Sequence, residues 1–272
     1  MTEPLQEVSD GVLEDIAYLA RSKHRVEILY LLSGASYSRG EVEGTTGIAR
    51  TTIDRIINEL EERGWAKRTT DGGYRATPTG EQVVTEFEPF VTSMDAIRNL
   101  GDLVAWLPTD DVPIELRHFR DSTVRRPDPT DPTSTVSYLT ALLREASEFH
   151  CIVGVAPPVA FEKMMRDRVV SGELTTEHVI TDEEYRYLLE HRNRPSRWRE
   201  YVTAGANLYR YDGVVPCNLF VFDDTVVIAH SQGEIGAPLV GIESLDETVR
   251  SWALEVIREY KTNAEQLDAD SF

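Results

Sequence analysis

Lysine, cysteine and long apolar runs are scarce in this chain of 272 residues. No apolar run approaches the roughly 18 residues that a membrane-spanning helix needs, so no such helix is expected. The N-terminal segment MTEPLQEVSDG lacks the basic region and apolar core of a signal peptide, which predicts a cytoplasmic protein. The two cysteines, Cys151 and Cys217, lie in apolar, strand-like runs, which predicts reduced thiols rather than a disulfide.

The charge is strongly acidic and unevenly distributed. Only four of the 28 basic residues are lysines, and 47 acidic residues give a formal net charge of -19. This composition is typical of halophilic proteins, because salt at about 1 M screens charges beyond roughly 3 Å and makes surplus carboxylates tolerable. A mildly acidic mesophilic protein is the alternative. Residues 91–272 carry 31 acidic and 18 basic residues, whereas residues 39–75 carry seven of each.

The segment from Ser36 to Thr77 has the pattern of two helices followed by a hairpin. Ser38 is suited to cap a short helix that ends near Gly47. A longer helix follows from Ala49, with apolar residues at helical spacing, namely Ile53, Ile56, Ile57 and Leu60. Two short strands then flank Asp71-Gly72-Gly73, which is hairpin-turn chemistry. This order predicts a winged helix-turn-helix, with the second helix in the DNA major groove.

Polar residues around this motif are the predicted DNA contacts. They come from the first helix, the N-terminal half of the second helix and the wing: Ser38, Arg39, Arg50, Thr51, Thr52, Arg55, Lys67, Arg68 and Arg75. Threonines and arginines at these places would bind phosphates or base edges. A three-helix bundle whose polar face has no DNA partner is the alternative.

A long, mainly helical stretch follows from Pro78 to about residue 106, with Thr77 as its cap. Its apolar residues recur at spacings of three and four, which predicts either pairing with a second copy in a homodimer or docking on the second domain. Pro89 is predicted to kink or interrupt this helix.

The remainder alternates between strand-like and helix-like segments, which predicts an α/β sheet covered by helices. A ligand would then lie at the carboxyl ends of the parallel strands, and the candidate ligand-binding residues are Gly154, Ala156, Asn218 and Asp223. Asp223 with Asp224 also suits a simple hairpin turn. The arginines between residues 192 and 199 suit either an anionic metabolite or a solvated, salt-bridged helix surface.

Two family resemblances rest on these motifs. The segment GIARTTIDRIINELEERGWAKRTTDGGYRATPTGEQV resembles the winged domain of archaeal regulators of the ArsR-like and TrmB-like kind, although Ala49 stands where such helices commonly begin with Ser or Thr. Residues 208–260, with LYRYDGVVPCNLFVFDDTVVIAHSQ and a Trp-containing last helix, resemble the sensor domain of an archaeal methanogenesis-regulator family. That resemblance implies a fold related to the phospholipase-D-like effector domain of TrmB sugar sensors over roughly residues 110–262.

Phospholipase D chemistry itself is not expected. None of the six histidines is followed two residues later by lysine, so the nucleophile and phosphate-binding residues of that site are missing. Neither common glycine-rich phosphate loop is present. We therefore predict no catalytic residue, no metal ligand and no cofactor.

The sequence as a whole predicts a mixed α+β and α/β chain in three parts. These are a winged helix-turn-helix domain over 1–80, a linker or dimerisation helix over 81–106 and an α/β sensor or dimerisation domain over 107–272. The predicted function is a dimeric transcription regulator that binds a pseudo-palindromic operator in double-stranded DNA and senses a small molecule or redox state. The alternative is a protein–protein interaction adaptor whose winged domain no longer binds DNA.

Overall fold

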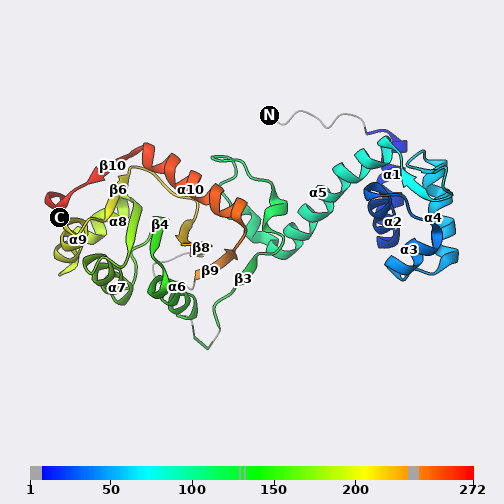
Figure 1. Ribbon diagram of the computed structural model, residues 1–272. Helices are drawn as coiled ribbons and strands as arrows, with labels where there is room; N and C mark the ends of the chain where they lie inside the picture. The colour runs from blue at the N-terminus through cyan, green and yellow to red at the C-terminus, as the bar shows by residue number, and fades with distance from the viewer. Residues whose placement is uncertain (1–7, 129, 132, 232–238) are drawn as a thin grey trace. The chain divides into compact units, whose positions relative to one another are not determined.

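A computed structural model describes residues 8–128, 130–131, 133–231 and 239–272 (Figure 1). The chain forms two compact units, Met1–Val91 and Thr92–Phe272. Helix α5 (Pro78–Leu100) carries the chain from the first unit into the second. Each unit has its own hydrophobic core, as expected for a chain of this length.

The first unit is a winged helix-turn-helix, as the sequence predicts. Its helices and strands precede α5 in the order α1 (Asp10–Ala20), α2 (Lys23–Gly34), α3 (Arg39–Thr46), α4 (Arg50–Glu62), β1 (Ala66–Arg68) and β2 (Tyr74–Ala76). Strands β1 and β2 pair antiparallel. A bridge between Tyr37 and Tyr74 ties the segment before α3 to the wing.

Local sequence determines where α3 and α4 begin and end. Ser38 and Glu41 form a capping box at the start of α3, which satisfies two helix amides that otherwise lack partners. Gly47 ends α3 with a φ of 69°, a left-handed conformation that suits glycine. Ile48 then enters the core beside the predicted stripe of α4, whose four apolar residues are all fully buried. Ala49 supplies no side-chain cap, so α4 begins uncapped.

Helix α5 is anchored at its start and runs unbroken through Pro89. The Thr77 hydroxyl accepts a hydrogen bond from the Gly80 amide at 3.1 Å and donates to the Gly64 carbonyl at 2.6 Å. The helix remains continuous to Leu100 and is followed by the 3-10 helix η1 (Gly101–Trp106). The predicted interruption at Pro89 therefore does not occur, because intact helical turns lie on both sides of the proline.

The second unit is built on a mixed sheet. Within the described residues its strand order is β10-β6-β5-β4-β7-β8-β9-β3. The strands are β3 (Thr123–Arg125), β4 (Glu148–Val153), β5 (Thr175–Thr181), β6 (Asn207–Tyr211), β7 (Asn218–Phe222), β8 (Thr225–Ser231), β9 (Leu239–Ser244) and β10 (Ala264–Leu267). Only β4, β5 and β6 run parallel to one another, and the other pairs are antiparallel.

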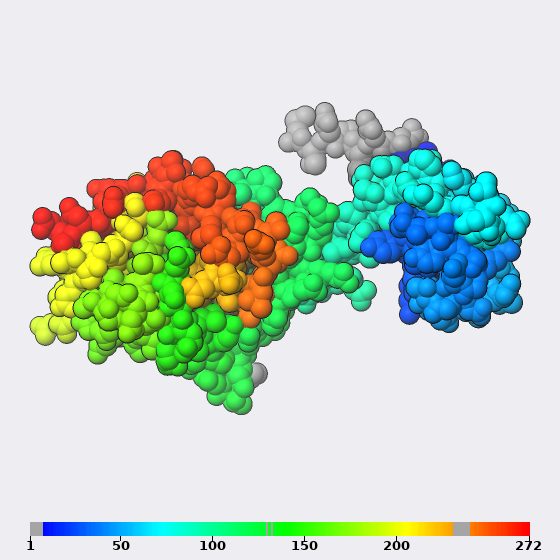
Figure 2. Space-filling model, viewed as in Figure 1, coloured from blue at the N-terminus to red at the C-terminus, as the bar shows by residue number. Residues whose placement is uncertain are grey.

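Helices cover both faces of this sheet. The helical elements are η2 (Leu116–Phe119), α6 (Ser134–Glu145), α7 (Val159–Val170), α8 (Asp182–Glu190), α9 (Arg194–Thr203), α10 (Glu247–Thr262) and η3 (Ala269–Ser271). Helices α6 to α9 pack on one face, and α10 packs on the other with η1 and η2. In the space-filling view α10, coloured orange to red, forms part of the outer surface (Figure 2).

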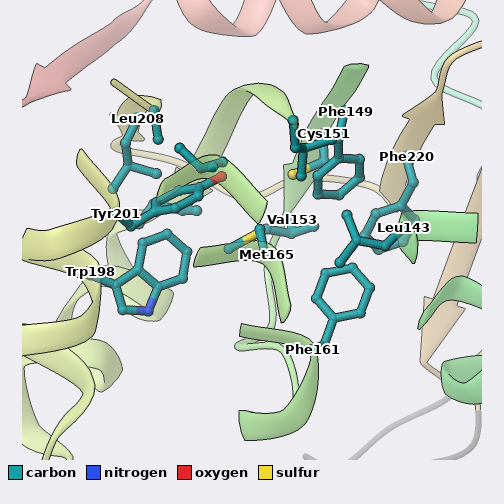
Figure 3. Close-up of a cluster of buried hydrophobic side chains, with 14 of the residues drawn as sticks. Leu143, Phe149, Cys151, Val153, Phe161, Met165, Trp198, Tyr201, Leu208 and Phe220 are labelled. Carbon is teal, nitrogen blue, oxygen red and sulfur yellow. The ribbon is translucent and has the colours of Figure 1, made fainter. Parts of the chain in front are cut away.

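The two cysteines lie in the two different cores and are free thiols. Figure 3 shows the sulfur of Cys151 among side chains from α7, α9, β4 and β7. Cys217 belongs to the core on the opposite face of the sheet. Burial raises the pKa of the Cys151 thiol, and burial together with nearby Asp111 raises the pKa of Cys217 to about 12. Both thiols therefore stay protonated and shielded from oxidants at neutral pH.

A buried ion cluster ties α9 to α7. The Glu162 side chain is 2% exposed, and it accepts hydrogen bonds from Arg194, from Arg197 at 2.9 Å and from the Trp198 indole at 3.3 Å. Arg194 also donates to the Pro157 carbonyl. Two of the arginines between residues 192 and 199, Arg194 and Arg197, are thus ion-pair partners of the buried Glu162 carboxylate. They form neither an anion-binding surface nor a solvated helix face, because Glu162 takes up their charge inside the fold.

Glu184 is a second buried carboxyl in this region. It lies in the first turn of α8 and is 2% exposed, and neither carboxyl oxygen has a hydrogen-bond partner among the described residues. Burial raises its pKa well above the usual value, and the charge of Glu162 adds to this effect while Arg194 opposes it. The group therefore keeps its proton at pH values where an exposed glutamate is ionised.

Glycine at position 80 is required by packing, and its replacement tests that requirement. An added Cβ would lie 2.0 Å from the Trp65 carbonyl oxygen. We expect Gly80→Ala to lower the free energy of unfolding by about 1–3 kcal/mol, measured by urea denaturation. Gly44→Ala is the matched control, since Gly44 lies in α3 with nothing within 4 Å of the new Cβ. It should raise the free energy of unfolding by about 0.5–1 kcal/mol, because alanine is more stable than glycine within a helix. Equal shifts for both variants would contradict the packing argument.

Replacement of Glu184 by glutamine should remove a pH dependence of stability. A carboxyl whose pKa is raised by folding contributes its full stability below the unfolded-state value of 4.5, and this contribution is lost as pH rises toward the folded-state value. The unfolding free energy of Glu184→Gln minus that of the wild type should therefore increase by roughly 1 kcal/mol per pH unit from pH 4.5 up to the folded-state pKa, and stay constant above it. Exposed Glu183, in the same turn, is the control, and Glu183→Gln should show no such trend. A pH-independent difference for Glu184→Gln would refute the assignment.

Candidate nucleic-acid interface

The buried stripe of α4 determines which of its side chains face outward. Because successive residues are about 100° apart around the helix, Thr51, Arg55 and Asn58 lie opposite the stripe. All three are exposed, and Thr52 is half-buried at the edge of this face. The predicted contacts Thr51 and Arg55 therefore lie on the outer face of α4. Asn58 shares that face, although sequence reasoning did not select it as a DNA contact.

Arg39 is held against α4 by several groups. Its Nε lies 3.0 Å from Asp54 Oδ1, and its Nη2 donates to Asn58 Oδ1 at 3.1 Å. The guanidinium also lies over the Tyr74 ring, 4.9 Å from the ring centre. The structure thus places this predicted DNA contact inside an α3–α4–wing contact network.

Two further predicted contacts are paired with carboxylates. Arg55 donates to Glu59 at 2.8 Å, and Arg75 lies 3.5 Å from Glu81. Partial burial acts to raise the pKa of Glu59, but the hydrogen bond and charge of Arg55 and the charge of Arg25 lower it below its usual range. Surface pairs of this kind contribute at most about 1 kcal/mol, so DNA phosphates can compete for these arginines.

Three of the predicted cations have no ion pair within the described part of the chain. Arg50 is the first residue of α4, and Lys67 and Arg68 lie on β1 of the wing. All three are exposed. They therefore provide unpaired positive charge at the start of α4 and on the wing.

The wing turn is held by side-chain hydrogen bonds and carries one negative charge. Thr69 donates to the Asp71 carboxylate, and this hydrogen bond lowers the pKa of Asp71. The hydroxyls of Ser36 and Thr69 are 3.0 Å apart, which links the turn to the segment before α3. Gly72 has a φ of 87°, so the turn uses the conformational freedom of glycine. The hydroxyl of Ser38, another predicted contact, accepts from the Glu41 amide.

The predicted ligand-binding residues of the second unit do not form one site. Asn218 is 5% exposed, and its Oδ1 accepts from the Gly154 amide at 2.9 Å, with half-buried Ala156 two residues further along. Gly154 follows the carboxyl end of β4, whereas Asp223 lies beside the amino end of β4, because β7 runs antiparallel to β4. Its carboxylate accepts from the Ser147 and Glu148 amides at 3.0 and 2.9 Å, so Asp223 stabilises the hairpin.

The described residues contain neither a candidate metal site nor a membrane-crossing helix. No group of three or more His, Cys, Asp or Glu side chains has the arrangement of a metal site there. No helix in those residues has the length and apolar character needed to cross a membrane.

Two family models match the chain in tandem. The HVO_A0261 N-terminal domain matches residues 13–99, and the middle domain of the methanogenesis regulatory protein FilR1 matches residues 132–263. Among curated proteins, the helix-turn-helix transcriptional regulator Rv1719 of Mycobacterium tuberculosis is 35% identical over 98 residues. That match covers 33% of this chain and 37% of the relative, so the chain spans little more than a third of that protein.

Solved structures show more distant similarity. The archaeal chromatin protein TrmBL2 is 16% identical, with 89% of this chain and 92% of that chain covered and a TM-score of 0.42. The phospholipase D family member Nuc from Salmonella typhimurium is 11% identical, with coverage of 54% and 99% and a TM-score of 0.43. The two tandem domain matches together span most of the chain, which thus combines a domain similar to the HVO_A0261 N-terminal domain with one similar to the middle domain of the methanogenesis regulatory protein FilR1.

Proposed function

We propose that this regulator acts in a high-salt cytoplasm as a homodimer that binds a pseudo-palindromic operator in double-stranded DNA. Helix α4 would enter the major groove, and the β1–β2 wing would lie along the backbone. The observation that supports this most directly is the placement of unpaired Arg50, Lys67 and Arg68 at the start of α4 and on the wing. These cations are suited to bind phosphates on either side of the groove.

The charge balance of the winged unit implies weak non-specific binding. Residues 39–75 carry seven basic and seven acidic residues, so this part of the unit has no net attraction for phosphate. Three phosphate contacts in each copy of a dimer would give a salt dependence of about -5 in log K against log salt. Sequence preference then depends on a few side chains of α4, with Thr51 and Arg55 on its outer face.

The proposed dimer contact is the exposed apolar face of α5. Phe90, Val91, Met94 and Ile97 recur at helical spacing, and each is 38–53% exposed. An apolar stripe of this length on one helix favours pairing with the same stripe of a second copy. Two copies would then present two α4 helices to successive half-sites of an operator.

The second unit is proposed to sense a small molecule rather than a redox state. The two thiols are 2% and 5% exposed and have raised pKa values, which makes them poor redox sensors. The proposed ligand-binding site remains at the carboxyl ends of β4 and β5, near Gly154 and Ala156. A ligand that binds one dimer arrangement more tightly would shift the population toward it and change the spacing of the α4 helices.

A protein–protein adaptor remains the second candidate. The observation that favours it is the pairing of Arg39, Arg55 and Arg75 with carboxylates of the same unit. In an adaptor these pairs would stay intact, and the winged unit would have no affinity for DNA.

DNA binding by the unpaired cations is tested by single alanine variants. Operator fragments would first be selected from genomic DNA, and binding would be measured by fluorescence anisotropy over a salt series. Arg50→Ala, Lys67→Ala or Arg68→Ala should weaken binding to all sequences alike and reduce the salt slope by about 1 per lost contact. Arg55→Ala should instead lower discrimination between sequences, by about 1–3 kcal/mol.

Lys163→Ala is the matched control, since Lys163 is exposed on α7 of the second unit and has no ion pair with any residue that the structure describes. It should leave affinity and salt slope unchanged. Equal and poor binding of random DNA by the wild type and by all variants would favour the adaptor.

The dimer contact is tested by placing charges on the α5 stripe. Wild-type protein should sediment at twice the chain mass of 30.7 kDa, whereas Phe90→Glu combined with Met94→Glu should sediment as a monomer. Two desolvated carboxylates in an apolar contact cost far more than a dimer of ordinary affinity can offset. Val170→Glu, at a 60% exposed position outside α5, should remain dimeric. A wild-type monomer, or a dimeric double variant, would exclude this contact.

A further inference from the structure

Asn58 has an orientation on the outer face of α4 that is determined by its neighbour. The side chain is exposed, lies opposite the buried stripe and accepts a hydrogen bond from Arg39 Nη2 at its Oδ1, at 3.1 Å. A guanidinium group donates hydrogen bonds and cannot accept them. The amide oxygen of Asn58 must therefore face Arg39, and the amide NH2 group is left to face away from it.

Arg39 is itself fixed, which makes this orientation stable. Its Nε lies 3.0 Å from Asp54 Oδ1, and both of these atoms are shielded from solvent. The Tyr74 ring lies beneath the guanidinium at 4.9 Å, a distance at which a cation is attracted to an aromatic face. Contacts from α4 and from the wing thus hold Arg39 in the position from which it binds Asn58.

We propose that Asn58 reads a base as a donor-only residue, and that Arg39 is the positioning residue that makes it so. An asparagine with both amide groups free binds adenine through one acceptor and one donor. With its oxygen turned toward Arg39, Asn58 presents its N–H donors, and not its oxygen, to a base. In the major groove guanine presents two acceptors, N7 and O6, whereas cytosine presents an amino donor. Asn58 therefore prefers guanine and disfavours cytosine at one base pair of each half-site.

This inference rests on the proposed DNA-binding function and changes the role of one predicted contact. Arg39 was expected to bind DNA directly, but its guanidinium forms an ion pair with Asp54 and donates a hydrogen bond to Asn58 within the same unit. Its effect on DNA is then exerted through the orientation of Asn58. A phosphate contact and a positioning residue predict different results for the same substitution.

The test is a base-preference profile, obtained by competition binding of the full-length protein to an operator library randomised at each position. Asn58→Ala should lose about 5- to 100-fold of discrimination at one base pair per half-site, with the mean affinity over all sequences changed less than about threefold. Asn58→Asp should move the preference at that position from guanine to cytosine, because a carboxylate only accepts. Gln82→Ala, which removes an exposed amide from α5 in the same unit, should leave the profile unchanged.

Arg39→Ala separates the two roles of the arginine. If Arg39 positions Asn58, the freed amide should accept adenine about as well as guanine at the same base pair, with an unchanged salt slope. Uniformly weaker binding, a salt slope reduced by about 1 and an unchanged profile would identify a phosphate contact and overturn the positioning role. A wild-type profile for Asn58→Ala would overturn the base-reading role while the DNA-binding proposal stands, whereas a wild type that binds no DNA would refute that proposal itself.

Discussion

The burial of one apolar stripe on α4 is the constraint on which the first unit depends. Its residues are fully buried against α2 and α3, so the rotation of α4 about its own axis is fixed. Because residues on a helix keep constant angular spacing, this burial also fixes which polar side chains face outward. The face that carries Thr51, Arg55 and Asn58 is thus a consequence of core packing. A one-residue shift of the stripe would turn a different set of side chains to the surface.

The elements of the winged unit were predictable because their signals are local. Capping by Ser38, the left-handed turn at Gly47, the period of the α4 stripe and the Gly-rich wing turn each depend on a few neighbouring residues. The charges were not predictable in this way. Whether Arg39 meets Asp54 or solvent depends on side chains from separate elements that meet only after folding. Sequence reasoning therefore predicted the helices and the wing that carry the proposed interface, but not which of its cations are engaged within the protein.

In the second unit, too, contacts between segments far apart in the sequence could not be predicted from local patterns. The turn at Asp223 was visible in the sequence, but its distance from Gly154 depends on the direction in which β7 pairs with β4. Burial of Arg194 was equally hidden, since arginine is almost never fully buried without a partner and its partner Glu162 lies 32 residues away. Strand direction and charge pairing are properties of the assembled sheet, and no local pattern encodes them.

Charge pairing has opposite consequences in the two units. Inside the second unit Glu162 binds two arginines away from water, where separation would leave an uncompensated buried charge, so these pairs are part of the core. On the winged unit the pairs of Arg55 and Arg75 involve side chains that are 52% exposed, and exposed pairs are weak enough to exchange partners. A highly acidic protein can bind DNA on this principle, because its surface carboxylates hold arginines in place without keeping them from a phosphate.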